Sequence, residues 1–113
     1  MIRALTTGHG FGYTQDCAEF CKKTHTLTLG DVTDAWIPWR DDCVRAGPPG
    51  QAGTFYFSRA GWCPGDVVYP HEVDVDLRGG DAAAFQWQVE PYTNEVDGGD
   101  PYLLLSAYLI SFE

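Results

Sequence analysis

The chain has 113 residues, of which 44 % are hydrophobic and 14 % aromatic, so it holds enough apolar side chains for one folded domain. Sixteen acidic residues against seven basic ones give it a net charge of −9. Nucleic acids and anionic membranes attract clustered lysine and arginine, and the sequence has no such cluster. No apolar run reaches the roughly 20 residues that a membrane-spanning helix needs. We therefore expect neither nucleic acid nor membrane as a partner.

Alternation of apolar and polar residues, typical of half-buried antiparallel strands, recurs along the chain. It covers residues 24–29, 71–77 and 84–90. The apolar faces consist of Leu27 and Leu29, then of Val73, Val75 and Leu77, and then of Phe85, Trp87 and Val89. His25 shares the apolar face of the first stretch, so we expect it to be a packed core histidine.

Two other stretches, residues 54–59 and 102–112, are apolar on both faces, and we expect them to be central strands. Glycine- and proline-rich turn signals separate the predicted strands, at 46–50, 78–80 and 97–101. No stretch has a convincing helical period. The pattern predicts an all-β antiparallel sandwich or jelly roll, with residues 1–113 forming a single domain.

The four cysteines stand at positions 17, 21, 43 and 63. Structural zinc sites usually take their ligands in close pairs, and only the first two cysteines are close, so zinc is disfavoured. No cysteine-hydrolase signature is present, which leaves disulfide bonds as the better interpretation. Disulfide bonds indicate an oxidising compartment.

A bond between Cys17 and Cys21 would require a bent backbone. Bridged Cα atoms lie roughly 4.4–6.8 Å apart, whereas four extended residues would separate them by about 13 Å. So small a ring removes little entropy from the unfolded chain, but it would fix the direction of Glu19 at its centre. We expect the ring to hold that carboxylate outward.

The segments "GHGFG", "CAEFCKKTHT" and "SRAGWCPG" together resemble the second jelly-roll domain of the peptide-N-glycosidase F family. That family hydrolyses the amide bond between an asparagine side chain and an N-linked glycan. The resemblance runs from about Thr6 to Phe112 and includes the closing "YTNEVDGGDPYLLLSAYLIS". It implies the disulfide pairs Cys17–Cys21 and Cys43–Cys63.

The resemblance also implies where a site would lie. Glu19 matches a carboxylate of the family's substrate cleft, Arg59 matches an arginine that faces the same cleft, and His9 matches a nearby histidine. In amide hydrolysis, Glu19 would bind sugar hydroxyls or orient water, and Arg59 would stabilise negative charge. The aromatic residues expected to stack on sugar rings are Trp36, Trp39, Trp62 and Tyr13. Trp62 has a structural alternative, packing on the disulfide, and Arg59 has another, pairing with a structural acid.

No metal or cofactor is expected. Copper-dependent jelly-roll enzymes need paired histidines and a methionine, whereas this chain has three scattered histidines and only Met1. The clusters of aspartate lack the EF-hand pattern, so a solvated acidic surface is the better interpretation.

The sequence departs from the family in two ways. Ser58 stands where the family often has aspartate, and the family's N-terminal jelly roll, which carries the principal catalytic aspartate, has no counterpart here. The first strands of the second domain are also missing, so we expect a β-sandwich incomplete at its N-terminus. We expect the chain to be the C-terminal portion of a larger secreted or periplasmic amidase that acts on N-linked glycoprotein together with the missing domain. The alternatives are a non-catalytic glycan- or protein-binding module, and a sheet whose open edge assembles with another chain.

Overall fold

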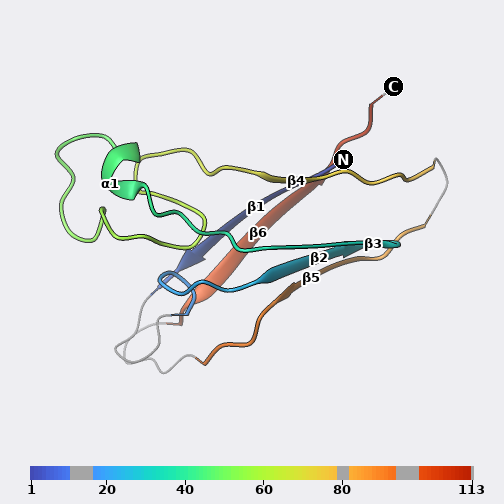
Figure 1. Ribbon diagram of the computed structural model, residues 1–113, viewed down its shortest axis with the longest axis horizontal. Coiled ribbons are helices and arrows are strands. Elements are labelled where there is room, and N and C mark those ends of the chain that lie inside the picture. Colours follow the sequence, from blue (N-terminus) through green and yellow to red (C-terminus); the bar gives the residue numbers. More distant parts are fainter. Residues whose placement is uncertain (11–16, 79–81, 94–99, 113) are drawn as a thin grey trace.

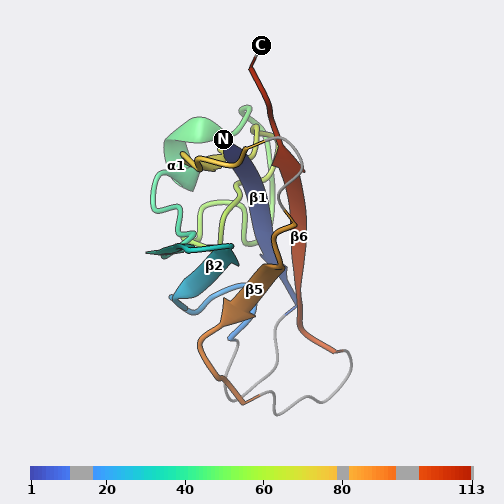
Figure 2. The same ribbon diagram turned by 90° about the vertical axis from the view of Figure 1, so that its right-hand side faces the viewer.

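The strands of the protein form two antiparallel sheets that pack against each other (Figures 1 and 2). The computed structural model describes residues 1–10, 17–78, 82–93 and 100–112. One sheet has the order β4–β1–β6 and consists of β1 (Ile2–His9), β4 (His71–Val73) and β6 (Tyr102–Leu109). The other has the order β3–β2–β5 and consists of β2 (His25–Leu29), β3 (Val32–Trp36) and β5 (Phe85–Val89). The prediction of an all-β sandwich is confirmed.

The order of the strands follows the plan of a jelly roll, which typically has about eight strands in two sheets joined by Greek-key connections. The six strands correspond to six consecutive strands of that plan. In the complete plan, β5 and β6 would each have one further neighbour. In the part of the chain that the structure describes, both strands lie at the edge of their sheet.

The core lies between β1 and β2. Ile2 and Ala4 of β1 pack against Leu27 and Leu29 of β2, and all four side chains are buried. Partly buried residues surround this cluster, namely Trp36, Val75, Leu77, Ala83 and Leu105. The predicted apolar faces of the stretches at 24–29 and 71–77 therefore point inward, although β4 itself ends at Val73.

Two of the strand predictions need correction. Residues 54–59 form no strand but a turn, in which the Phe57 N–H donates to the Thr54 carbonyl at 3.0 Å. β6 is a strand as expected, but it lies at the edge of the described sheet and not in its centre. Three residues on its outer face, Tyr102, Leu104 and Tyr108, are more than half exposed.

Three elements lay outside the prediction: β1, β3 and the four-residue helix α1 (Cys43–Ala46). The buried face of β1 carries Ile2, Ala4, Thr6 and Gly8, of which only the first is a large apolar residue. Small and polar residues give a weak alternation signal, which explains why the strand was missed.

His25 is a core residue, as predicted. It is 1 % exposed and contacts the rings of Trp36 and Trp87. Its Nδ1 atom accepts a hydrogen bond from the Trp87 Nε1–H at 3.1 Å, so the imidazole is neutral in the folded protein. Burial lowers its pKa from 6.5 to about 4.

This lowered pKa predicts a loss of stability in mild acid. Because the unfolded chain binds the proton more tightly, the contribution of neutral His25 is complete above about pH 6.5 and declines as the pH falls toward 4. The total is up to about 3 kcal/mol. Urea unfolding of the wild type and of His25→Gln between pH 7 and pH 4.5 will measure it. Equal pH dependence in the two proteins would contradict the assignment.

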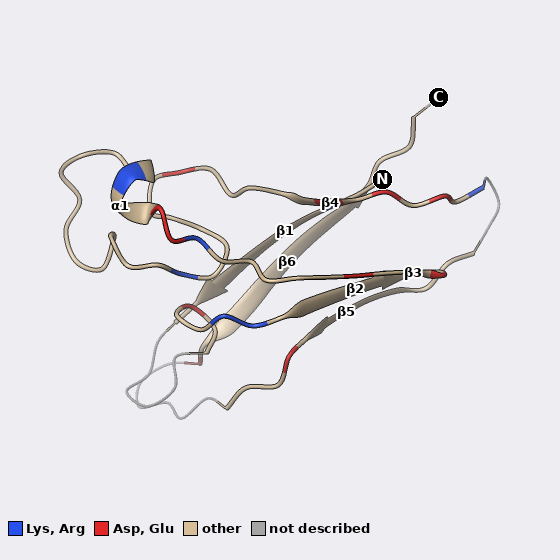
Figure 3. Ribbon diagram, in the orientation of Figure 1, with Lys and Arg blue, Asp and Glu red and all other residues tan. Residues whose placement is uncertain are grey.

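Within the described ranges, no helix has the length and apolar character needed to cross a membrane. Figure 3 shows that lysine and arginine gather mainly toward the end of the molecule that carries α1, whereas aspartate and glutamate are spread along it. The candidate site lies at this more basic end.

Candidate active site

A disulfide bond between Cys17 and Cys21 closes a small ring of five residues. The two Cα atoms are 4.4 Å apart and the enclosed backbone is a turn, so the predicted bend and bond are both found. The ring packs directly on the end of β1 at Gly8, where a Cβ atom would overlap the backbone carbonyl of Ala18. Only glycine allows this approach.

Backbone hydrogen bonds join the ring to the segment that carries Arg59. The Gly8 N–H donates to the Ala60 carbonyl at 3.0 Å, and the Ala60 N–H donates to the Glu19 carbonyl at 2.8 Å. Two neighbouring segments, around Gly8 and around Glu19, therefore meet a third segment around Arg59, which is 40 residues beyond Glu19. The motifs "GHGFG", "CAEFC" and "SRAGWC" each supply one of them.

Glu19 and Arg59 form a buried ion pair at this junction. One guanidinium nitrogen of Arg59 donates to Glu19 Oε1 at 2.9 Å, and the Gly10 N–H donates to Oε2 at 3.0 Å. The two residues are 8 % and 2 % exposed. The expectation of an outward carboxylate is therefore wrong: the ring holds Glu19 beside Arg59, as the resemblance implies, but mostly inside the protein. Burial lowers the pKa of Arg59 and the charge of Glu19 opposes this shift, while an arginine side chain remains charged at neutral pH.

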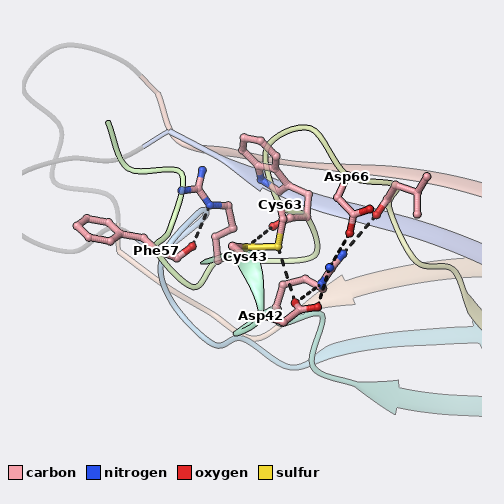
Figure 4. Close-up of polar contacts among 9 residues, drawn as sticks. Asp42, Cys43, Phe57, Cys63 and Asp66 are labelled. Carbon is pink, nitrogen blue, oxygen red and sulfur yellow. Dashed lines mark hydrogen bonds and ion pairs between the residues drawn. A yellow bond between two sulfur atoms is a disulfide. The ribbon is translucent and has the colours of Figure 1, made fainter. Parts of the chain in front are cut away.

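The guanidinium of Arg59 also fixes the loop before it. It donates to the carbonyl oxygens of Phe57, at 3.3 Å, and of Thr54 (Figure 4 shows the bond to Phe57). The same group lies over the rings of Phe20 and Trp62, with 5.3 and 4.8 Å from Cζ to the ring centroids. Arg59 is thus held on several sides, which makes its position rigid.

Trp62 and His9 lie beside the ion pair. The Trp62 Nε1–H donates to the Gly8 carbonyl at 2.8 Å, so the indole joins the "SRAGWC" segment to β1. The His9 ring lies 5.1 Å from that of Trp62 and 5.3 Å from that of Tyr102, and its Nε2 is 2.7 Å from Thr7 Oγ1. Both residues therefore belong to the neighbourhood of Glu19 and Arg59.

Trp36 and Trp39 lie elsewhere. They line a separate pocket of about 200 Å³, whose lining includes neither Glu19 nor Arg59. The structure thus divides the predicted site residues into an ion pair with its neighbours and a second, aromatic pocket. Tyr13 lies outside the described residues.

Arg40 is a residue of this region that sequence reasoning missed. It is 7 % exposed, and its backbone pairs with that of Arg59 through hydrogen bonds of 2.8 and 3.0 Å. Its guanidinium binds Asp42 at 2.7 Å and Asp66 at 2.8 Å, next to the Cys43–Cys63 disulfide (Figure 4). Hydrogen bonds that the two aspartates accept from Arg40 lower the pKa of both, and the bonds that Arg40 donates to Asp42 raise the pKa of Arg40.

The two disulfide bonds are expected to differ in their effect on stability. In the chain-entropy model, loss of the longer Cys43–Cys63 loop costs about 3 kcal/mol and loss of the Cys17–Cys21 ring about 2 kcal/mol. Urea unfolding of the two double alanine variants will compare them. An equal or larger loss for Cys17→Ala/Cys21→Ala would mean that the ring stabilises the folded state through its contacts at Gly8, and not by its entropy alone.

The fold and the site define a class: a jelly-roll sandwich in which a disulfide-closed ring presents a glutamate to a buried arginine. Residues 1–110 match the family described as peptide-N-glycosidase F, C terminal, and the chain belongs to this family.

Two similar proteins support the same relation. The chain is 28 % identical over 119 residues to peptide-N(4)-(N-acetyl-beta-D-glucosaminyl)asparagine amidase F of Elizabethkingia miricola; the match covers 97 % of this chain and 33 % of that protein. The chain therefore spans about a third of the length of this relative. A solved structure of PNGF-II superposes with a TM-score of 0.59 at 22 % identity, over 94 % of this chain and 20 % of the other, which shows a shared fold.

Proposed function

We propose that the chain is the C-terminal portion of an amidase that hydrolyses the bond between an N-linked glycan and asparagine. The main observation behind this proposal is the Glu19–Arg59 ion pair. Its two side chains are held together by the disulfide ring, by β1 and by the "SRAGWC" segment. The name of the Elizabethkingia miricola relative states this activity for that protein. Two disulfide bonds support a secreted or periplasmic location.

The burial of the pair suggests how it would act. A carboxylate that already binds a guanidinium and a backbone N–H is preorganised, so it keeps its position while a substrate reacts. Such a pair would orient water or a sugar hydroxyl at the edge of the site. The remaining groups, including the principal catalytic acid or base, would come from the part of the enzyme that this chain does not span.

A chimera will test the proposal. The chain replaces the matched third of the Elizabethkingia miricola amidase, and glycan release from a denatured glycoprotein is measured for the chimera and for the chain alone. We expect activity only in the chimera, and at least about a 100-fold loss on Glu19→Gln. Glutamine is nearly isosteric and keeps an acceptor for Arg59, and a thermal melt will confirm that the variant is folded. A folded Glu19→Gln chimera with full activity would show that Glu19 has no part in the reaction.

The second candidate function is a non-catalytic glycan-binding module. The observation that favours it is the 2 % exposure of Arg59, whose guanidinium is occupied by protein groups. Glycan binding by the chain that survives Glu19→Gln but not loss of Trp39, together with a folded chimera that releases no glycan, would select this function.

A further inference from the structure

The pocket that contains Trp36 and Trp39 is lined mainly by two segments, residues 36–40 at the end of β3 and after it, and residues 69–71 leading into β4; Thr6 of β1 and Gly61 complete the lining. It has a volume of about 200 Å³. Six of its lining residues carry the argument, namely Trp36, Pro38, Trp39, Arg40, Tyr69 and His71. The pocket is smaller than the roughly 300–1,000 Å³ of sites for drug-sized ligands, so it suits a single ring.

The walls of this aromatic pocket are fixed by contacts within the protein. The rings of Trp36 and His71 stack with centroids 4.4 Å apart and planes 6° apart. The guanidinium of Arg40 lies 4.3 Å from the centroid of Tyr69, which still remains 57 % exposed. A ligand would therefore meet a preformed surface with an accessible aromatic ring, and its apolar face would be buried there.

Several backbone polar groups of these two segments have no hydrogen-bond partner in the part of the chain that the structure describes. Among the described residues, none donates to or accepts from the backbone of residues 37–39 or 68–69. These segments present both N–H donors and carbonyl acceptors beside the aromatic walls. A ligand with hydroxyl groups satisfies both kinds, because each hydroxyl donates and accepts.

The charged residues that line the pocket are already paired, and next to it the Lys22 ammonium lies over the Trp39 ring, 5.5 Å from its centroid. Arg40 binds Asp42 and Asp66, and His71 Nε2 lies 2.6 Å from Asp34 Oδ2. A charged ligand would have to displace one of these partners, whereas a neutral one would not. The pocket therefore favours a neutral, ring-shaped ligand with several hydroxyl groups.

We propose that the aromatic pocket binds one neutral pyranose ring, at a subsite separate from Glu19 and Arg59. The choice of carbohydrate rests in part on the proposed function; the separate location rests on the lining residues alone. The apolar C–H face of the sugar packs on Tyr69 and Trp39, and its hydroxyls bind the free backbone groups.

The test is a titration of the ¹⁵N-labelled chain with the methyl glycosides of mannose, galactose and N-acetylglucosamine. The four indole N–H signals serve as reporters: Trp36 and Trp39 line the pocket, while the indoles of Trp62 and Trp87 donate to protein groups elsewhere. With at least one glycoside, we expect saturable shifts of the Trp36 and Trp39 signals only. A ligand of about 13 non-hydrogen atoms should give a Kd near about 1 mM.

Matched variants make the test specific. Tyr69→Ala should weaken binding at least about 10-fold, and Tyr108→Ala, at a tyrosine of nearly equal exposure on β6, should leave it unchanged. Absence of saturable shifts with all three glycosides would overturn the proposal. So would shifts centred on Trp62, or equal effects of the two alanine variants. The titration measures binding and not catalysis, so a negative titration would contradict the sugar subsite without affecting the amidase proposal. An inactive chimera would contradict the amidase proposal without affecting the subsite.

Discussion

Replacing Arg59 with methionine should destabilise the fold by about 3–5 kcal/mol, the cost of removing one partner from a buried ion pair. Among the described residues, the substitution leaves the buried Glu19 carboxylate with the Gly10 N–H as its one remaining hydrogen-bond donor. It also removes the donors to the carbonyls of Thr54 and Phe57. Urea unfolding at pH 7 will give the change in free energy.

The protein supplies a matched control for this prediction. Arg3 and Glu72 form a pair of similar geometry, at 2.6 Å, but their side chains are 44 % and 41 % exposed. Arg3→Met should therefore cost less than about 1 kcal/mol. A double variant, Arg59→Met with Glu19→Leu, should recover part of the loss because it removes the unpaired charge. If Arg59→Met costs no more than Arg3→Met, the buried pair is not what holds the site together.

Replacing Gly61 with alanine should cost about 3–5 kcal/mol, for two reasons that add. Gly61 has a φ of +80°, which a side chain strains, and a Cβ atom there would overlap the backbone carbonyl of Thr6 in β1. Because the obstacle is backbone, the "RAGWC" segment would have to move away from the sheet. Chemical denaturation will measure the loss.

Substitution of Gly50 serves as a control that separates the cost of the positive φ from the cost of the steric overlap. Its φ is +86°, yet a Cβ atom would meet nothing within 4 Å. Gly50→Ala should therefore cost only the conformational part, about 1–2 kcal/mol. A loss at Gly61 no larger than that at Gly50 would show that the close approach to β1 does not matter for stability.

The sequence predicted those features that depend on strong apolar alternation or on covalent spacing. His25, Leu27 and Leu29 form a buried face because alternate residues of a strand point to the same side. In a sandwich, the side that carries the large apolar residues must face the core. The bond between Cys17 and Cys21 followed from the short separation of the two cysteines together with the family resemblance.

The failures have a common physical cause, which is tertiary context. Residues 54–59 are apolar enough for a strand, but the guanidinium of Arg59 captures two of their carbonyls and holds a turn. The burial of Glu19 was missed for the same reason, since its partner lies 40 residues away and the depth of both depends on how the ring packs on Gly8. Arg40 carries no sequence signal that separates it from a solvent-exposed arginine.

The edge strand β6 has a consequence for any neighbour it meets. Met1 and Ile110 exchange two backbone hydrogen bonds, so the alternating pattern of an antiparallel ladder turns the amides of residues 102, 104, 106 and 108 toward β1. The amides of residues 103, 105, 107 and 109 point the other way. Amide hydrogen exchange along β6 would therefore distinguish the two edges of the strand. A second polypeptide that paired with the open edge would slow exchange at the odd-numbered residues and leave the exchange rates of the even-numbered residues unchanged.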